Sequence, residues 1–248
     1  MLAFVTGASA GFGTAIARRL VAEGHRVVGT GRRRERLDAV RDELGEAFLP
    51  LAFDIADRAA TEATVAALPE SWREIDLLVN NAGLALGLSP AQDADIDDWE
   101  RMVDTNVKGL MRLTRLLLPA MVARGSGHVV MIGSVAGRYP YPGGNVYGAT
   151  KAFVRQFALN LRADLHGTGV RVTDIQPGLV GGSEFSVVRF GGDESRAARF
   201  YADADPLTPE DIAETVHWVA ALPPRVNINM IELMPVSQGF GALPVHRG

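Results

Sequence analysis

Residues 2–13 read LAFVTGASAGFG, and the order of features in this stretch decides the fold. The apolar run at 2–6 has the length of a buried strand, and a glycine-rich loop follows it directly. After the loop, Ile16, Leu20 and Val21 recur at the spacing of one helix face. A strand, a glycine-rich turn and a helix in this order predict the first unit of a mostly parallel sheet.

The rest of the chain repeats this alternation of short apolar runs and segments with helical periodicity. Six further runs are predicted as strands, at residues 26–30, 48–53, 76–80, 128–133, 170–175 and 230–234. The chain has 248 residues, 47% of them hydrophobic, and no linker divides it, so we expect one domain over 1–248. The predicted fold class is α/β, with a Rossmann-type doubly wound sheet of about seven parallel strands and helices on both faces.

Two segments interrupt the alternation. Residues 179–207 carry glycine pairs and no strong period, which favours a substrate lid over packed core. Helix is expected to resume after Thr208 as N-cap, with Pro209 in the first helical position and Asp211 completing a capping box. The non-periodic tail, 235–248, is expected to be disordered or docked on a neighbouring subunit.

The composition excludes several classes of partner and site. With 25 basic and 29 acidic residues, the net charge of -4 gives no electrostatic reason to expect nucleic acid or an anionic membrane. The absence of cysteine excludes disulfides, zinc–thiolate sites and cysteine catalysis. No run reaches the roughly 18 apolar residues of a membrane span, and the first residues leave no room for a signal peptide. We therefore expect a cytoplasmic protein with a small-molecule partner, and no metal site because the five histidines lack ligand spacing.

The glycine-rich loop has the composition of a phosphate-binding turn. Gly7, Gly11 and Gly13 would allow a tight turn and a close approach of the backbone to a pyrophosphate, which the N-terminus of the next helix would also attract. Their spacing differs from the GxGxxG fingerprint. A glycine-rich turn without a ligand is the alternative.

The residues after the second predicted strand indicate which dinucleotide is bound. About 20 residues beyond the loop, NAD-binding chains carry an acidic residue for the ribose diol. Arg32, Arg33 and Arg34 stand here instead, and guanidinium groups bind phosphate through charge-assisted forks. NADP is therefore favoured over NAD, with Arg32 and Arg33 as the contacts; a solvated basic helix start is the alternative. The Asp54 carboxylate could accept a hydrogen bond from the adenine amine, or it could be hydrogen-bonded only by backbone N–H groups.

The stretch 133–151, GSVAGRYPYPGGNVYGATK, carries the candidate reaction site. Ser134 ends a predicted strand, and ligands of doubly wound sheets bind at the carboxyl ends of strands. Tyr147 and Lys151 are four residues apart and would share one helix face. A phenol with a pKa near 10 is a poor acid or base at neutral pH, so we expect Lys151, together with the positive nicotinamide of an oxidised cofactor, to lower the pKa of Tyr147. A tyrosine and a lysine also reach this spacing by chance, so the hypothesis depends on all three residues and the glycine loop together.

These motifs resemble those of a known family. The short-chain dehydrogenase/reductases carry the same elements in the same order: TGASAGFG, NNAG, DTNVKG with Asn106, Ser134, YGATK, and Pro177-Gly178. Longer stretches, GGNVYGATKAFVRQF and DLHGTGVRVTDIQPGLVGGSEFS, are similar to those of bacterial NADP-dependent 3-hydroxy acid dehydrogenases within it. The resemblance implies hydride transfer between NADP and the hydroxyl carbon of a small 3-hydroxy acid or β-hydroxy amino acid, or reduction of the matching carbonyl.

The resemblance also implies roles for individual residues. Tyr147 would exchange a proton with the reacting oxygen, Ser134 would hydrogen-bond that oxygen, and Lys151 would hold the nicotinamide ribose. Asn106 would help to hold a water that relays protons towards Lys151. Ser183 stands where the family commonly has threonine, and it keeps a hydroxyl. The predicted cofactor contacts are Gly7, Ser9, Gly11, Phe12, Gly13, Arg32, Arg33, Asp54, Ile55, Asn81, Ala82, Gly83, Tyr147, Lys151, Pro177, Gly178, Val180 and Ser183.

Substrate recognition requires a cation for the carboxylate of a hydroxy acid. Arg189 in the lid is the predicted residue, with Arg138 and Arg196 as further candidates, and each of them could equally be a solvated surface arginine. Tyr141 and Phe185 are predicted as apolar walls of the substrate pocket, unless they only pack the lid.

Two features leave alternatives open. The segments 99–122 and 147–165 are more apolar than one sheet face requires, and the resemblance implies that they pair into dimers and a homotetramer, although core packing is an equal explanation. The activity could instead be reduction of another carbonyl, such as a 3-oxoacyl thioester, a ketone or a sugar. A non-catalytic dinucleotide-binding sensor on the same fold is the remote alternative.

Overall fold

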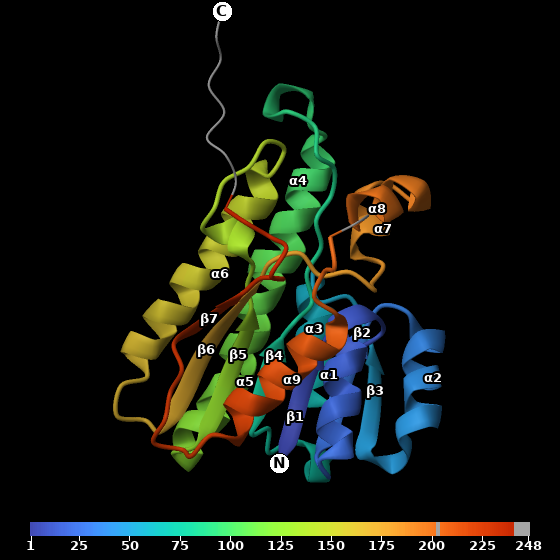
Figure 1. Ribbon diagram of the computed structural model, residues 1–248. Coiled ribbons are helices and arrows are strands. Elements are labelled where there is room, and N and C mark those ends of the chain that lie inside the picture. The colour runs from blue at the N-terminus through green and yellow to red at the C-terminus, as the bar shows by residue number, and fades with distance from the viewer. Residues whose placement is uncertain (202–203, 241–248) are drawn as a thin grey trace, which may run out of the picture.

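The computed structural model describes residues 1–201 and 204–240, and a single parallel sheet forms its centre (Figure 1). The seven strands of the described residues stand in the order β3-β2-β1-β4-β5-β6-β7. Their bounds are Leu2–Thr6 for β1, Arg26–Gly31 for β2, Phe48–Ala52 for β3, Leu77–Asn80 for β4, Gly127–Ile132 for β5, Val170–Pro177 for β6 and Met230–Leu233 for β7. Each predicted apolar run is a strand, with ends shifted by at most two residues.

Helices connect consecutive strands, as a parallel sheet requires. In the described residues they are α1 Gly11–Ala22, α2 Arg34–Leu44, α3 Arg58–Ala66, α4 Ile96–Val103, α5 Leu110–Arg124, α6 Asn145–Asp164, α7 Phe185–Arg189, α8 Glu194–Tyr201 and α9 Pro209–Ala221. One π-helical turn, Asp104–Gly109, joins α4 to α5 and contains Asn106. Such turns interrupt the regular hydrogen-bond ladder and are frequent at functional sites.

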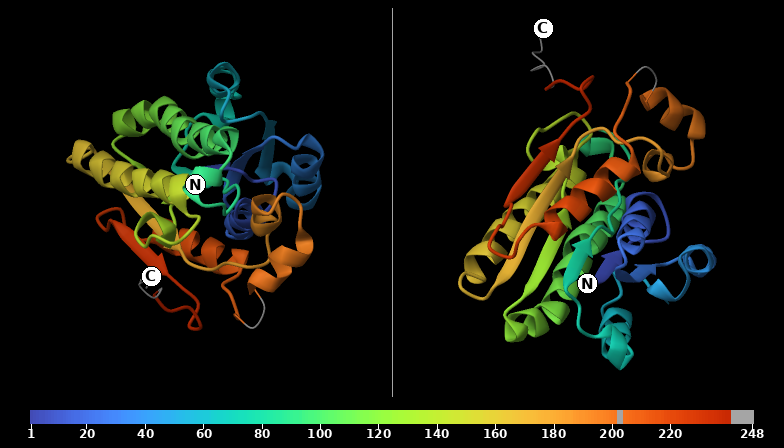
Figure 2. Two further views of the ribbon diagram at one scale, coloured as in Figure 1. Left: turned by 90° about the horizontal axis from the view of Figure 1, so that it is seen from above. Right: turned by 60° about the horizontal axis from the view of Figure 1, so that its bottom comes forward.

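Both faces of the sheet are buried, which explains why the strands read as continuous apolar runs. Phe4 of β1 packs into a cluster with α5 and α6, whereas its neighbours Ala3 and Val5 pack with α1, α2 and α9. Figure 2 shows these two helical layers on opposite sides of the sheet. The prediction of a doubly wound α/β sheet is confirmed.

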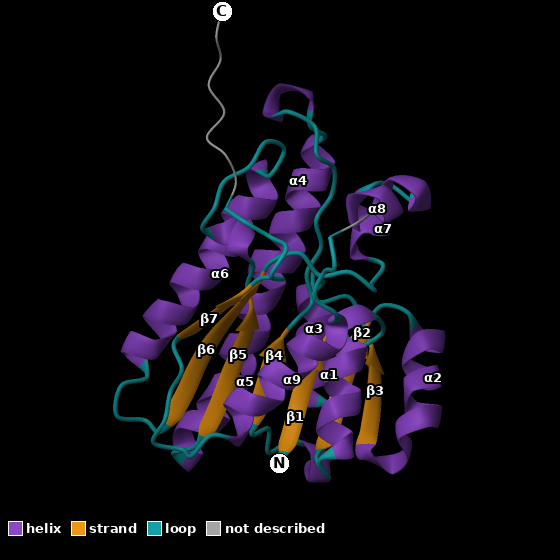
Figure 3. Cartoon of the chain, viewed as in Figure 1, coloured by secondary structure: helices purple, strands orange, loops and turns teal. Residues whose placement is uncertain are grey.

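The order of the strands determines where a ligand can bind. The chain leaves β1 towards β2 and later returns to β4 on its other side, so the loops after β1 and β4 diverge and open a crevice. In Figure 3 all arrowheads point to the same end of the sheet, and α7 and α8 lie over that end. The loops that carry the predicted site residues therefore meet there.

The segment 179–207 contains two short helices, α7 and α8, that the sequence did not reveal. Helices of 5 and 8 residues are too short to show a clear period. The two ends of the segment meet, because Val180 bridges to Leu207 and Gly181 N–H donates to the Leu207 carbonyl at 2.8 Å. Helix α9 then begins with the predicted capping box of Thr208 and Asp211, and Pro209 follows the N-cap.

The described part of the tail, residues 235–240, packs on its own chain rather than being disordered, and docking of the tail on a neighbouring subunit stays a prediction. The Gln238 side chain accepts a hydrogen bond from Leu179 N–H at 2.7 Å, and the rings of Phe240 and Tyr139 lie 5.0 Å apart. Residues 241–248 of the predicted tail lie outside the described residues. Nowhere in the described chain is a helix both long and apolar enough to cross a membrane.

Candidate active site

A cavity of about 640 Å³ opens at the carboxyl ends of the strands, under α7. Nearly every predicted cofactor and substrate residue lines it: Gly7, Ser9, Gly11, Phe12, Arg32, Arg33, Asp54, Ile55, Asn81, Ala82, Gly83, Ser134, Tyr141, Tyr147, Lys151, Pro177, Gly178, Val180, Ser183, Phe185 and Arg189. Predicted residues that are up to 182 positions apart in the sequence thus line one cavity.

Two predicted residues, Gly13 and Asn106, lie outside this lining. A Cβ at Gly13 would stand 2.2 Å from the Gly7 carbonyl oxygen, so Gly13 allows α1 to pack against the loop rather than touching a ligand. The Asn106 amide donates to the Leu84 carbonyl at 2.9 Å and to the Thr150 hydroxyl at 3.1 Å. With both N–H groups occupied, the side chain braces the segment after β4 against α6, and the part of Asn106 in a water relay stays a prediction.

The glycine loop has the geometry of an anion site. Gly7 and Gly11 have φ values of 69° and 52°, in the left-handed region that favours glycine. The N-cap of α1, Ala10, makes no side-chain capping bond, and the first turn contains no acidic residue. The N–H groups at this helix end therefore remain available to a pyrophosphate.

Thr6, which was not among the predicted site residues, fixes the turn opposite the glycine loop. Its hydroxyl accepts hydrogen bonds from the backbone N–H groups of Asn81 and Ala82 at 2.9 and 2.8 Å. The Asn81 amide donates to the Thr6 carbonyl at 2.7 Å, which ties the end of β4 to the end of β1. The only signal in the sequence was a hydroxyl residue at the end of the first strand. Asn81 and Ala82 therefore form a rigid floor of the cavity.

The three arginines after β2 have different surroundings. The Arg32 side chain is 63% exposed, and its nearest acidic group, Asp54, lies 4.0 Å away. Arg33 instead pairs at 2.7 Å with Glu184, just before α7, and Arg34 pairs at 3.1 Å with Asp38 on its own helix. Of these three, Arg32 is the guanidinium that is open to a phosphate.

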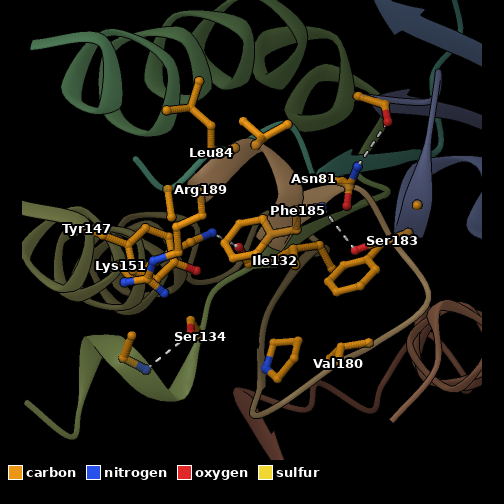
Figure 4. A pocket seen from close by; sticks show the side chains of 18 of the residues that line it. Asn81, Leu84, Ile132, Ser134, Tyr147, Lys151, Val180, Ser183, Phe185 and Arg189 are labelled. Atoms are coloured by element: carbon orange, nitrogen blue, oxygen red, sulfur yellow. Dashed lines mark hydrogen bonds between the residues drawn. The ribbon is translucent and has the colours of Figure 1, made fainter. Parts of the chain in front are cut away.

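Ser134, Tyr147 and Lys151 converge at the inner end of the cavity (Figure 4). Ser134 caps a short helical turn by accepting from Ala136 N–H at 3.1 Å, directly after β5. Tyr147 and Lys151 lie on the first two turns of α6, and the Lys151 Nζ is 5.9 Å from the centre of the Tyr147 ring. Lys151 donates to the Ile132 carbonyl at 2.8 Å, which anchors the ammonium beneath the cavity.

Burial controls the protonation of this group of residues. It raises the pKa of Tyr147 to about 12, while hydrogen bonding with Ser134 acts in the opposite direction. Burial lowers the pKa of Lys151 to about 8, and the negative charge of Asp174 partly offsets this. The predicted lowering of the Tyr147 pKa depends on the positive nicotinamide of an oxidised cofactor as well as on Lys151, and it stays a prediction; the protein's own groups raise this pKa, because loss of solvent outweighs the nearby charges. Tyr147 is therefore a neutral phenol at physiological pH, ready to donate a proton.

Arg189, the last residue of α7, lies over the Tyr147 ring, with 5.4 Å between the guanidinium carbon and the ring centre. It is only 9% exposed. Its Nη2 donates to the Tyr141 hydroxyl at 2.7 Å and its Nε to the Gly87 carbonyl at 3.3 Å. Both partners are neutral, and no ion pair of residues 1–201 and 204–240 includes Arg189. The guanidinium thus brings an uncompensated positive charge to Tyr147.

The other predicted substrate residues separate into two groups. Phe185 packs on Tyr147 with 5.9 Å between tilted rings, so it forms a wall of the pocket, as does Tyr141. Arg138 pairs with Glu232 at 3.3 Å, and Arg196 stacks on the Phe190 ring; both lie outside the cavity lining.

Comparison with known proteins shows the family of this chain. The family model described as short chain dehydrogenase matches residues 1–188. The chain belongs to the short-chain dehydrogenase family. The resemblance seen in the sequence is thereby confirmed.

Individual members of the short-chain dehydrogenase family match this chain over its whole length. The NADP-dependent 3-hydroxy acid dehydrogenase YdfG of Salmonella typhi is 63% identical over 247 residues, 100% of both chains. The serine 3-dehydrogenase of Agrobacterium fabrum is 55% identical, covering 98% of this chain and 97% of that protein. A solved structure described as the closed form of serine dehydrogenase complexed with NADP+ superposes with a TM-score of 0.99 at 59% identity, over 100% of both chains.

Proposed function

We propose that this short-chain dehydrogenase uses NADP to oxidise the hydroxyl of small 3-hydroxy acids or β-hydroxy amino acids, such as serine and L-allo-threonine, or to reduce the matching carbonyl. The observation that carries this proposal is the buried guanidinium of Arg189, which lacks a carboxylate partner among the described residues and lies over Tyr147. A buried charge without a counter-ion is costly. A substrate carboxylate would relieve that cost and would fix the substrate beside the catalytic tyrosine.

The relatives support the same assignment. Their names describe dehydrogenases of 3-hydroxy acids and of serine, and the solved structure with the TM-score of 0.99 carries NADP+. Because that structure is a closed form and superposes over the whole chain, we infer that the described residues of the lid, 179–201 and 204–207, stand here in a closed position.

The residues that line the cavity fit each part of NADP. The uncapped N-terminus of α1 and the left-handed glycines would hold the pyrophosphate, and Arg32 would bind the 2′-phosphate. Asp54 would meet the adenine, and the segment from Pro177 to Ser183 would line the nicotinamide. When bound, the cofactor supplies the carbon that accepts or donates the hydride.

Tyr147 and the residues around it would then transfer the proton to or from the reacting oxygen. In the reducing direction the neutral Tyr147 phenol donates a proton to the carbonyl oxygen, while Ser134 hydrogen-bonds the same oxygen. Lys151, held under the cavity by the Ile132 carbonyl, is placed to bind the nicotinamide ribose hydroxyls. Oxidation requires the phenolate and is therefore favoured at high pH.

Asn106 would act through its backbone rather than its side chain. Its amide is committed to Leu84 and Thr150, and it lies in the π-helical turn Asp104–Gly109, where carbonyl groups are released from the regular ladder. A water bound by such a carbonyl would complete a proton path towards Lys151.

The assembly that we propose is a homotetramer in the cytoplasm. Large apolar side chains are exposed along α4 and α5: Ile96, Met111, Leu116 and Val122. Identical faces of this kind pair across two-fold axes. Light scattering on the purified protein would give the mass, and a monomer at micromolar concentration would contradict the proposal.

The decisive experiment compares acids with their neutral isosteres. Purified protein is assayed for reduced nicotinamide with NADP or NAD and with serine, serinamide, 3-hydroxypropionate or 3-hydroxypropionamide. We expect turnover with NADP and a strong preference for each acid over its amide. Equal rates for acid and amide would refute the role of Arg189, and activity only on thioesters, ketones or sugars would favour a different carbonyl reductase. Tight NADP binding without turnover of any substrate would favour the sensor alternative.

A further inference from the structure

Glu184 joins the start of α7 to the basic end of the cofactor cavity. Its two carboxylate oxygens accept from different arginines, Oε2 from Arg33 Nη1 and Oε1 from Arg36 Nη1, each at 2.7 Å. The hydrogen bond from Arg33, followed by that from Arg36, lowers the pKa of Glu184 below its ordinary value, so the group is ionised at neutral pH. Arg33 and Glu184 are 151 residues apart in sequence, so these contacts connect two distant segments.

The other end of α7 carries Arg189. The helix has 5 residues, Phe185–Arg189, too few to hold a position by its own hydrogen bonds. Its last residue is fixed by the Tyr141 hydroxyl and by the backbone of Gly87, whose N–H donates to the Arg189 carbonyl at 3.1 Å. The position of the Arg189 guanidinium therefore depends on contacts at both ends of the helix.

The three arginines Arg32, Arg33 and Arg36 differ in whether they line the cavity and in whether they pair with Glu184. Arg32 lines the cavity and is open, whereas Arg36 lies outside the lining and faces Glu184. Arg33 lines the cavity but is already paired with Glu184. Arg36 therefore offers a way to weaken the contact with α7 without altering a group that lines the cofactor cavity.

We propose that Glu184, paired with Arg33 and Arg36, is a positioning residue that latches α7 over the cofactor and so orients Arg189 towards the substrate carboxylate. The inference rests on the proposed function. The paired side chains are 41 to 48% exposed, so the latch is weak and sensitive to salt. Such a latch allows α7 to open for exchange of substrate.

The test uses Glu184→Gln and Arg36→Ala, with Arg34→Ala as matched control. Arg34 lies on the same helix and has a similar exposure, but it pairs with Asp38 instead of the lid. Both latch variants should raise the KM for serine roughly three- to tenfold with little change in kcat, and should not raise the KM for NADP. Arg36→Lys should recover most of the loss. Added salt should raise the KM of the wild type and affect the latch variants less.

Amide hydrogen exchange of the NADP-bound protein tests the latch without any substrate. The N–H groups of Val188 and Phe190 bond to Glu184 and Ser186 within the lid, and they should exchange faster in Glu184→Gln and Arg36→Ala than in the wild type or Arg34→Ala. Wild-type exchange rates in both latch variants would overturn the proposal. So would a raised KM for NADP with an unchanged KM for serine, which would place Glu184 in cofactor binding. Faster exchange in a protein that turns over no hydroxy acid would refute the proposed function and support the latch.

Discussion

Replacing Arg189 with methionine separates substrate recognition from the rest of the active site. Methionine keeps the length and much of the volume of the side chain but removes its charge. The change deletes two hydrogen bonds to neutral groups, to the Tyr141 hydroxyl at 2.7 Å and to the Gly87 carbonyl at 3.3 Å. Each costs about 1 kcal/mol of stability, and removal of a buried charge offsets part of this. We therefore expect a folded protein that still binds NADP.

The loss of substrate binding should be much larger. Truncating one partner of a buried, hydrogen-bonded charge pair costs about 3 to 5 kcal/mol, which corresponds to roughly 150- to 5,000-fold in kcat/KM for serine. Most of the change should appear in KM, because the carboxylate is bound equally in the ground state and in the transition state. For serinamide, which has no carboxylate, we expect a change of less than about threefold.

Two further variants act as controls in the same assay. Tyr141→Phe removes the hydroxyl that orients Arg189 but keeps the ring, so a smaller loss of roughly fivefold is expected. Arg196→Met removes a lid arginine that stacks on Phe190 outside the cavity and should leave kcat/KM unchanged. If Arg189→Met reduced the rates with serine and serinamide by the same factor, Arg189 would have a structural role and our argument would be refuted.

Three other predictions concern protons and the cofactor. Because burial raises the pKa of Tyr147, kcat/KM for oxidation should rise with pH in the alkaline direction as the phenolate forms; a flat profile would exclude Tyr147 as the base. His128 is buried with a pKa lowered from 6.5 to about 3, so the unfolded state gains a proton first and stability falls as pH drops below about 6.5. In urea unfolding, His128→Asn should reduce the loss of unfolding free energy between neutral pH and about pH 5 by about 2 kcal/mol. If the variant and the wild type lost the same unfolding free energy over this range, the prediction would be contradicted. The double change Arg32→Ala and Arg33→Ala should raise the KM for NADP roughly 10- to 150-fold and that for NAD much less, whereas equal effects would count against a phosphate contact.

The sequence predicted the features that depend on local order. The apolar runs identified the strands because the central strands are buried on both faces and the edge strands β3 and β7 are partly buried. The capping box at Thr208 and Asp211 depends only on residues three positions apart. The glycine loop could be placed for the same reason, since Gly7 and Gly11 adopt left-handed backbone angles directly after β1. These features do not require knowledge of distant contacts.

The properties of the site that could not be predicted from the sequence depend on burial and on distant partners. The effect of burial on the Tyr147 pKa could not be inferred from a lysine four residues away, because it comes from exclusion of water by the whole fold. Arg189 could not be distinguished from a solvated arginine, since its partners Tyr141 and Gly87 are 48 and 102 residues away. The same holds for Glu184, whose arginine partners belong to the opposite end of the chain.

The net charge of the chain and the local charge of its cavity affect the binding of different kinds of anion. An overall charge of -4 disfavours long polyanions, which are held by many weak contacts spread over a surface. A small anion is held by one or two guanidinium groups in a site with little water, where the local charge dominates. This cavity has such groups at both ends, with Arg32 open at the end for the 2′-phosphate and Arg189 buried beside Tyr147. A substrate that carries one carboxylate close to its hydroxyl would pair with Arg189, so it satisfies this charge distribution better than a neutral ketone.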